Sequence, residues 1–287
     1  MENERMVKNK YLFSKWVSYI FEAPFLAIPT FIILNLILDM NNFLIIETIC
    51  LLFATIIPVL VLLLWRKTKG VDINFTIKES RNYPLLIATL IYFLGTFILW
   101  LFSANPLIMA VMFCYGSNTL IVFFINLKWK ISIHSMGVTG PTIALLFINP
   151  WFFILGLIGP LVMWSRLVLK KHTVSQVLVG SLLGYLLTAI QLYFLTKLMH
   201  FNVNVEFYLI LLIITGLTLP SLLLSLKSYL DNNHFYDRYV SKILYFLVFG
   251  LFFVFLSFFS FIPSIALILS GSISIVIEYF ETHVFHG

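Results

Sequence analysis

Histidine, arginine, lysine and serine side chains gather in three short segments of a chain that is only 10% charged. These segments cover residues 66–83, 128–134 and 165–176. Fixed cations and helix N-terminal amides stabilise the negative charge that spreads over the oxygens of a phosphoryl group in transfer. Imidazole can act in the same reaction as the nucleophile or as the acid and base. These residue types therefore indicate chemistry on a phosphate.

The third segment, "SRLVLKKHTVSQ", has the most specific spacing. If it is helical, Ser165, His172 and Gln176 lie on one face, because offsets of seven and four residues are close to whole turns. Gln176 can then contact His172. Gly180 and Gly184 continue this face, and small residues four apart let another helix backbone approach closely.

Long apolar runs make up the rest of the chain. Its 287 residues are 61% hydrophobic, with a mean hydropathy of +1.03, which lies far outside the composition of soluble domains. Runs of about 20 apolar residues can cross a bilayer as helices. The expected spans are 16–39, 43–65, 84–103, 105–127, 132–148, 150–165, 173–196, 205–226, 242–260 and 263–281, of which the last two can form one run. The sequence thus predicts an all-α, polytopic transmembrane helix bundle of about nine or ten helices.

The charges of this bundle are distributed unequally. In the expected topology all 18 Lys and Arg except Lys197 fall on the face of the N-terminus, which the positive-inside rule places in the cytoplasm. The net charge of +6 favours anionic substrates and membrane lipids as partners, and we expect no nucleic acid. The two cysteines have no metal-like spacing, and we expect no metal or cofactor. Glu22 and Glu47 lie within apolar runs, where a carboxylate serves transport or substrate binding, or else is protonated or near an interface.

The third segment resembles the third signature of the type 2 phosphatidic acid phosphatase superfamily, in which Ser-Arg is followed after five residues by His and four residues later by Asp. Ser165, Arg166 and His172 match this signature, and Gln176 stands where the family has Asp. A Gln can accept a hydrogen bond from the histidine but lacks the charge that raises its basicity. The run "HTVSQV" is also similar to the dolichyl or polyprenyl diphosphatase branch, which points to isoprenoid diphosphates.

The other two signatures are matched less fully. The second, Pro-Ser-Gly-His, resembles "ISIH", so that its Ser falls on Ser132 and its His on His134. The first, Lys followed after six residues by Arg-Pro, is echoed by "KGVDINFTIKESRNYP". Arg81 is the matching Arg, whereas Asn74 occupies the Lys position and the Pro is displaced to Pro84.

The resemblance implies a metal-independent phosphatase that works through a phosphohistidine. In that mechanism His172 attacks phosphorus, Gln176 orients it, and His134 protonates the departing lipid oxygen and later activates water. The phosphate ligands that the resemblance implies are Arg81, Arg166, Ser132 and Ser165, with Lys78 or Lys69 replacing the missing Lys. The catalytic core would cover residues 66–197, between N-terminal helices in 1–65 and additional transmembrane helices in 198–287.

The substrate expected from these patterns is an isoprenyl (polyprenyl) diphosphate or a related lipid phosphate. Two alternatives remain open: a lipid phosphotransferase, and a non-catalytic lipid-binding or transport protein on the same fold. We expect a multi-pass cell-membrane protein whose site faces the cytoplasm. The resemblance leaves the outer face open as well, because many bacterial relatives work there.

Overall fold

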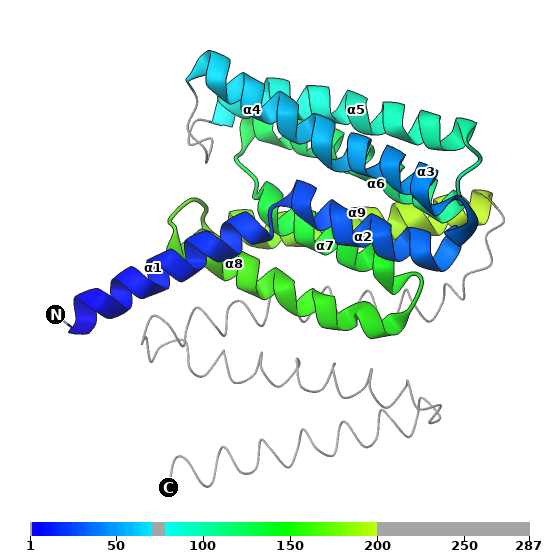
Figure 1. Ribbon diagram of the computed structural model, residues 1–287. Coiled ribbons are helices and arrows are strands. Elements are labelled where there is room, and N and C mark those ends of the chain that lie inside the picture. The colour runs from blue at the N-terminus through cyan, green and yellow to red at the C-terminus, as the bar shows by residue number, and fades with distance from the viewer. Residues whose placement is uncertain (1, 71–77, 200–287) are drawn as a thin grey trace, which may run out of the picture. The chain divides into compact units, whose positions relative to one another are not determined.

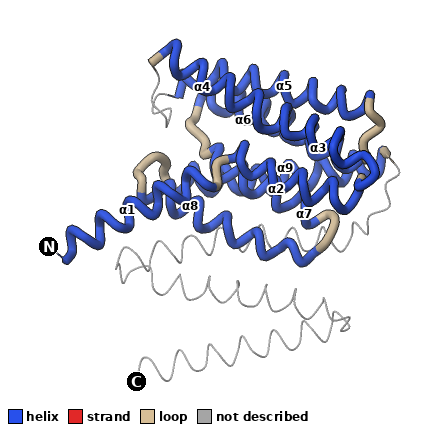
Figure 2. The backbone as a smooth tube through the Cα atoms, viewed as in Figure 1, coloured by secondary structure: helices blue, strands red, loops and turns tan. Residues whose placement is uncertain are grey.

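The computed structural model describes residues 2–70 and 78–199, and this part of the chain consists of helices and their connections, without a strand (Figures 1 and 2). In chain order the helices are α1 (Glu2–Ile20), α2 (Ala23–Leu38), α3 (Phe43–Leu51), α4 (Ile57–Lys69), α5 (Asn82–Leu101), α6 (Pro106–Lys128), α7 (Ile133–Leu146), α8 (Ile158–Val168) and α9 (Val174–Leu198). The prediction of an all-helical fold is confirmed for these residues. The expected spans 205–226, 242–260 and 263–281 lie outside the described residues, as does the expected C-terminal division from residue 200 onward.

Several of these helices have the length and composition of membrane spans. Four segments are long and apolar enough to cross a bilayer, and a fifth is added if the bent pair of α1 and α2 counts as one span. The four are Met40–Lys69, Glu79–Leu101, Pro106–Lys128 and Val174–Leu198. Large apolar side chains are exposed along them, among them Leu64, Leu90, Phe97 and Phe194. Such surfaces suit contact with lipid, and the described helices are compatible with a multi-pass membrane protein.

The first expected span is interrupted. Instead of one helix over residues 16–39, α1 and α2 meet at an angle of 51°. Pro24 has no backbone N–H and its ring would clash with the carbonyl group of Ile20, so a continuous helix cannot pass this point. Glu22 lies at the break, between the two helices.

Two further spans are less regular than predicted. The span expected at 43–65 contains a π-helical stretch, Leu52–Ile56, just before Pro58, whose missing N–H removes one helical hydrogen bond. The span expected at 150–165 begins with a 3₁₀ helix, Pro150–Leu157, and becomes α-helical only in α8. Neither irregularity changes the direction of the chain across the bundle (Figure 1).

Helix α7 is the central element of the described part. It packs against α2, α6, α8 and α9, and nearly all of its residues from Ser135 onward are buried. Its contact with α9 is close because that helix presents glycines to it. A Cβ atom on Gly180 would lie 2.5 Å from the carbonyl oxygen of Ser132, and one on Gly184 would lie 2.8 Å from that of Met136. The predicted close approach of a second helix at these two glycines is confirmed.

Substitution of Gly180 by alanine is expected to lower the free energy of unfolding by about 1 to 3 kcal/mol, because backbone atoms must move to admit the new methyl group. Thermal unfolding in detergent micelles would measure this loss. Gly156→Ala is the matched control, since its Cβ would meet the Tyr185 hydroxyl group at 3.5 Å and Thr142 Cγ2 at 3.8 Å, both ordinary contacts. Equal unfolding temperatures for Gly180→Ala and the wild type would contradict the close packing of α7 on α9.

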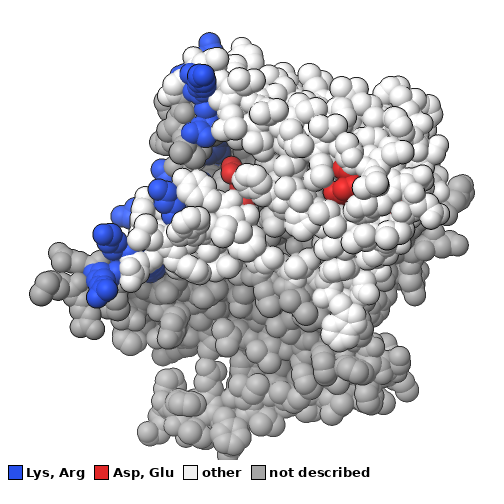
Figure 3. All heavy atoms as spheres, in the orientation of Figure 1, with Lys and Arg blue, Asp and Glu red and all other residues white. Residues whose placement is uncertain are grey.

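The described parts of the three polar segments lie at one end of this bundle. The N-terminal ends of α5, α7 and α9 all lie at the end where α1 begins (Figure 1). Lys and Arg side chains gather along the same end, and the rest of the visible face of the described part is almost free of them (Figure 3). The helices therefore bring together polar segments that lie far apart in the sequence.

Candidate functional site

The connection between α8 and α9 is a tight helix end rather than a continuing helix. Lys170 has a φ of 52°, and the Lys171 N–H donates to the carbonyl oxygen of Arg166 at 3.1 Å. This is the hydrogen bond of a Schellman motif, which ends a helix through one left-handed residue. Residues 165–176 therefore do not form one helix, which agrees with the separate spans expected at 150–165 and 173–196. Ser165 belongs to a different helix from Gln176, so the condition for a shared helical face is not met.

Gln176 contacts His172, as the sequence predicted, but through the start of α9. The Gln176 Oε1 atom lies 3.1 Å from His172 Nδ1 and accepts the Thr173 N–H at 3.2 Å, while the Thr173 hydroxyl group accepts the Gln176 N–H. Thr173 and Gln176 thus form a capping box. Because Oε1 already faces a backbone donor, His172 Nδ1 must be the donor to it, and Nε2 is the unprotonated ring nitrogen.

His172 is a buried, neutral imidazole. It is 8% exposed, and burial, followed by the positive charges of Arg166 and Arg81, lowers its pKa to about 3. The ring therefore carries no charge at neutral pH, and the lone pair of Nε2 is free to act as a nucleophile. A bound phosphate would partly offset the two guanidinium groups and raise this pKa.

The second polar segment forms the start of α7 and is joined directly to α9. The Ser132 hydroxyl oxygen caps α7 by accepting the Ser135 N–H at 3.4 Å and lies 2.9 Å from the Ser135 hydroxyl oxygen. The Ser132 N–H donates to the carbonyl oxygen of Gln176 at 3.2 Å. His134 follows within the first turn of α7 and is half-buried. The two histidine segments are therefore held together by a backbone hydrogen bond.

Two buried guanidinium groups complete this cluster. Arg81 is 6% exposed and donates through Nη1 to the carbonyl oxygen of Ile131 at 3.4 Å. Arg166 is 1% exposed and donates through Nη1 to the Ser18 hydroxyl group at 2.6 Å. Both guanidinium groups act electrostatically on both imidazoles, so all four side chains lie in one neighbourhood. We call these four residues the basic cluster.

Other candidate phosphate ligands have different surroundings. The Ser165 hydroxyl group donates to the carbonyl oxygen of Val162 at 2.7 Å and is engaged within α8. The Lys69 ammonium group lies 5.7 Å from the ring centroid of Trp65. The side chain of Lys78 lies outside the described part. Neither lysine is therefore placed at the basic cluster by the structure.

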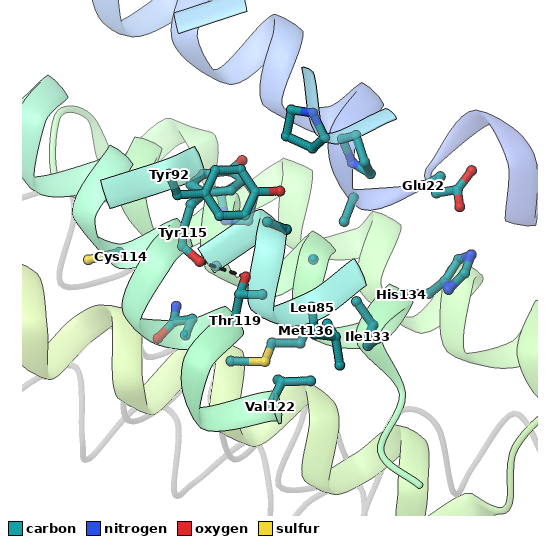
Figure 4. A pocket seen from close by; sticks show the side chains of 18 of the residues that line it. Glu22, Leu85, Tyr92, Cys114, Tyr115, Thr119, Val122, Ile133, His134 and Met136 are labelled. Carbon is teal, nitrogen blue, oxygen red and sulfur yellow. Dashed lines mark hydrogen bonds between the residues drawn. The ribbon is translucent and has the colours of Figure 1, made fainter. Parts of the chain in front are cut away.

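A cavity of about 200 Å³ extends from the basic cluster into the apolar interior. Glu22 and His134 lie at one end and Tyr92 and Tyr115 at the other (Figure 4). Arg81 also lines the cavity and acts electrostatically on His134. Arg81 and Tyr92 are eleven residues apart, which corresponds to about 16 Å along a helix. This depth is about half the thickness of the hydrocarbon core of a bilayer.

Three residues at this end of the bundle were not among the predicted site residues. Ser18 bonds to Arg166, and the carboxylate of Glu22 interacts electrostatically with Arg166 and with Arg66. Glu22 had a sequence signal, because it is a carboxylate in an apolar run. Arg66 had none, because it is one of several cations at a helix end. Glu47, the other carboxylate within an apolar run, accepts a 2.6 Å hydrogen bond from Asn35.

No family model, curated protein or solved structure matches this chain. Within the described residues, no group of three or more His, Cys, Asp or Glu side chains is placed to hold a metal ion. The chemistry of the site therefore has to be inferred from its own geometry.

Proposed function

We propose that this chain is a membrane lipid phosphatase that hydrolyses an isoprenyl diphosphate or a related lipid phosphate through a phosphohistidine. One observation carries this proposal: two imidazoles and two buried guanidinium groups from three separate segments act electrostatically on one another, and two of them, Arg81 and His134, line an apolar cavity. Guanidinium groups suit phosphate oxygens, and an apolar cavity suits a lipid chain. The N-terminal ends of α7 and α9 at the same place add positive partial charge.

The cavity favours a substrate with a single extended chain. An extended backbone advances about 3.5 Å for every three bonds, so a hydrocarbon chain of about 14 bonds matches a depth of 16 Å. An isoprenyl chain of this length would lie between α4, α5, α6 and α7, with its phosphate at Arg81 and His134. A longer chain would have to leave the cavity between helices.

In the proposed reaction His172 Nε2 attacks the terminal phosphorus atom while the bond from that phosphorus to the leaving oxygen breaks. His134, which takes up a second proton when the anionic substrate is bound, donates this proton to the leaving oxygen, and the lipid product departs. His134 then takes a proton from water, whose oxygen attacks the phosphohistidine and breaks the N–P bond. Inorganic phosphate is released, and His172 and His134 return to their starting protonation states.

The purified full-length chain should release phosphate in EDTA from an isoprenyl diphosphate, and His172→Ala should reduce this release to background. Phosphatidate and phosphatidylglycerophosphate serve as comparison substrates with two chains. Equal background release from both proteins would rule out the proposal. Phosphate transfer that requires an added lipid acceptor would instead identify a phosphotransferase, which shares the phosphohistidine.

A second candidate function is lipid binding without turnover, and one observation favours it. Gln176 is fully accounted for as the capping residue of α9, and it gives His172 no carboxylate partner. An uncharged partner orients the imidazole but adds no basicity. A protein that binds the diphosphate tightly but releases no phosphate would fit this alternative.

We also propose that the basic cluster faces the cytoplasm, because the cationic side chains gather at its end of the bundle (Figure 3). Lys67 is exposed at this end, in the last turn of α4. Labelling of Lys67→Cys by a membrane-impermeant reagent in intact cells would contradict this orientation.

A further inference from the structure

The break between α1 and α2 is packed against α7, one turn from His134. A Cβ atom on Gly137 would lie 3.0 Å from Ala23 Cα and 3.7 Å from Ala23 N, so the two backbones are in contact at this glycine. His134 is three residues before Gly137 and lies on the same face of α7, where such positions are about 5 to 6 Å apart. Glu22 directly precedes Ala23, so its side chain can reach the imidazole.

The Glu22 side chain faces the cavity instead of capping α2. Its backbone carbonyl oxygen accepts the N–H groups of Phe25 and Leu26 at 2.9 and 3.2 Å, whereas its side chain makes no capping hydrogen bond. The carboxylate lies at the same end of the cavity as the His134 ring (Figure 4). Among the described residues that line the cavity, Glu22 is the only one with a carboxylate. The helix start uses the backbone of Glu22 and leaves its charge to the cavity.

The other charges around Glu22 and His134 are positive. The groups that act electrostatically on one or both of them are Arg66, Arg81, Arg166 and His172. His172 is neutral, so the charged members of this set are guanidinium groups. Guanidinium groups oppose the protonation of a nearby imidazole, whereas a carboxylate favours it. Besides the bound substrate, Glu22 is therefore the group that can offset these cations when His134 takes up its second proton.

We propose that Glu22 is a positioning residue for His134, whose carboxylate pairs with the imidazolium form of His134 in the substrate complex and keeps a proton available for the leaving oxygen. Glu22 itself exchanges no proton with the substrate: His134 gives its proton to the lipid oxygen and later takes one from the attacking water. The carboxylate of the site then acts on the acid and base, whereas the nucleophile His172 is oriented by the uncharged Gln176. This inference rests on the proposed function.

Glu22→Gln in the full-length chain tests the pairing, because it removes the charge and keeps the length of the side chain. With an isoprenyl diphosphate, kcat at neutral pH should fall about 10- to 100-fold, and the alkaline limb of its pH profile should move to lower pH, because the charge that favours a protonated His134 is lost. p-Nitrophenyl phosphate needs no proton on its leaving oxygen, so phosphoryl transfer from it should continue at the wild-type rate. Glu22→Asp keeps the charge and should restore part of kcat.

Glu47→Gln is the matched control. It removes the other carboxylate within an apolar run, which does not line the cavity, and it keeps an oxygen that can accept the hydrogen bond from Asn35. Both kcat and its pH profile should stay unchanged. Loss of phosphoryl transfer from p-nitrophenyl phosphate in Glu22→Gln would overturn the inference, because Glu22 would then support the whole site and not His134 alone.

The titration of His134 separates this inference from the proposed function, because it needs no turnover. It is followed by NMR of ring-labelled histidine, with inorganic phosphate as the bound anion, and is assigned with His134→Gln. His134 should titrate at lower pH in Glu22→Gln than in the wild type. An unchanged titration would overturn the pairing even if the wild type hydrolyses lipid phosphates. A lower titration in a chain that releases no phosphate would keep the pairing and reject the hydrolysis.

Discussion

Replacement of His134 by alanine is expected to slow phosphate release from an isoprenyl diphosphate by about 10²- to 10⁴-fold, the usual contribution of a positioned acid and base. The imidazole lines the cavity mouth beside Arg81 and acts electrostatically with His172. It is therefore the group available to protonate a leaving oxygen whose lipid chain lies in the cavity. Without it, both the departure of the lipid and the activation of water are slow.

A substrate with a good leaving group separates these two steps. p-Nitrophenyl phosphate needs no proton on its leaving oxygen, so His134→Ala should still transfer the phosphoryl group to His172. The variant should then show a burst of p-nitrophenol equal to the enzyme concentration, followed by slow turnover, with acid-labile phosphate on the protein. His134→Ala combined with His172→Ala should abolish the burst. Loss of the burst in His134→Ala alone would contradict the assigned role of His134. Turnover of this variant at the wild-type rate would contradict it as well.

The described helices could be predicted from the sequence because long apolar runs determine where a chain can cross a membrane. Their interruptions were harder to predict. Pro24 and Pro58 are visible in the sequence, but a proline within a membrane helix is also tolerated when neighbouring groups satisfy the freed backbone. Only the surrounding helices decide whether the chain bends at such a point.

Residues 165–176 also show how far a local sequence pattern can predict the structure of the site. The contact between Gln176 and His172 was predicted from helical spacing, and it exists, but the cause is the capping box of α9. Thr173 and Gln176 are a visible capping-box pattern, which by itself marks a new helix start and contradicts a helix that continues from α8. The left-handed Lys170 had no sequence signal, because a glycine is the usual residue there.

Long-range contacts account for what the sequence could not supply. Glu22 comes within electrostatic reach of both Arg66 and Arg166 only because distant parts of the chain lie together in the bundle. No local pattern relates residues separated by a hundred positions. The signatures predicted which residue types converge, whereas the partners of the guanidinium groups depend on the packing of whole helices.

Arg166 should be the most sensitive of the guanidinium groups. Arg166→Lys is expected to reduce kcat/KM by about 10²- to 10³-fold, which is typical of removing a preorganised donor for developing charge, because an ammonium group cannot reproduce the planar fork. Arg166→Gln should reduce it at least as much and should also raise the pKa of His172, since the charge of Arg166 is one of the causes that lower it. The lysine variant keeps the charge and should leave that pKa low.

These two readouts distinguish a phosphate ligand from a residue that only supports the fold. NMR titration of ring-labelled histidine, assigned with His172→Gln, gives the pKa, and steady-state kinetics give kcat/KM. Ser18→Ala is the matched control: it removes only the hydroxyl group that accepts the 2.6 Å bond from Arg166, and it should reduce kcat/KM less than Arg166→Lys does because the guanidinium group is retained. Wild-type activity in Arg166→Lys would show that charge alone suffices. An unchanged His172 titration in Arg166→Gln would show that the guanidinium group does not act on this imidazole, because the electrostatic effect of Arg166 on His172 requires the two side chains to lie close together.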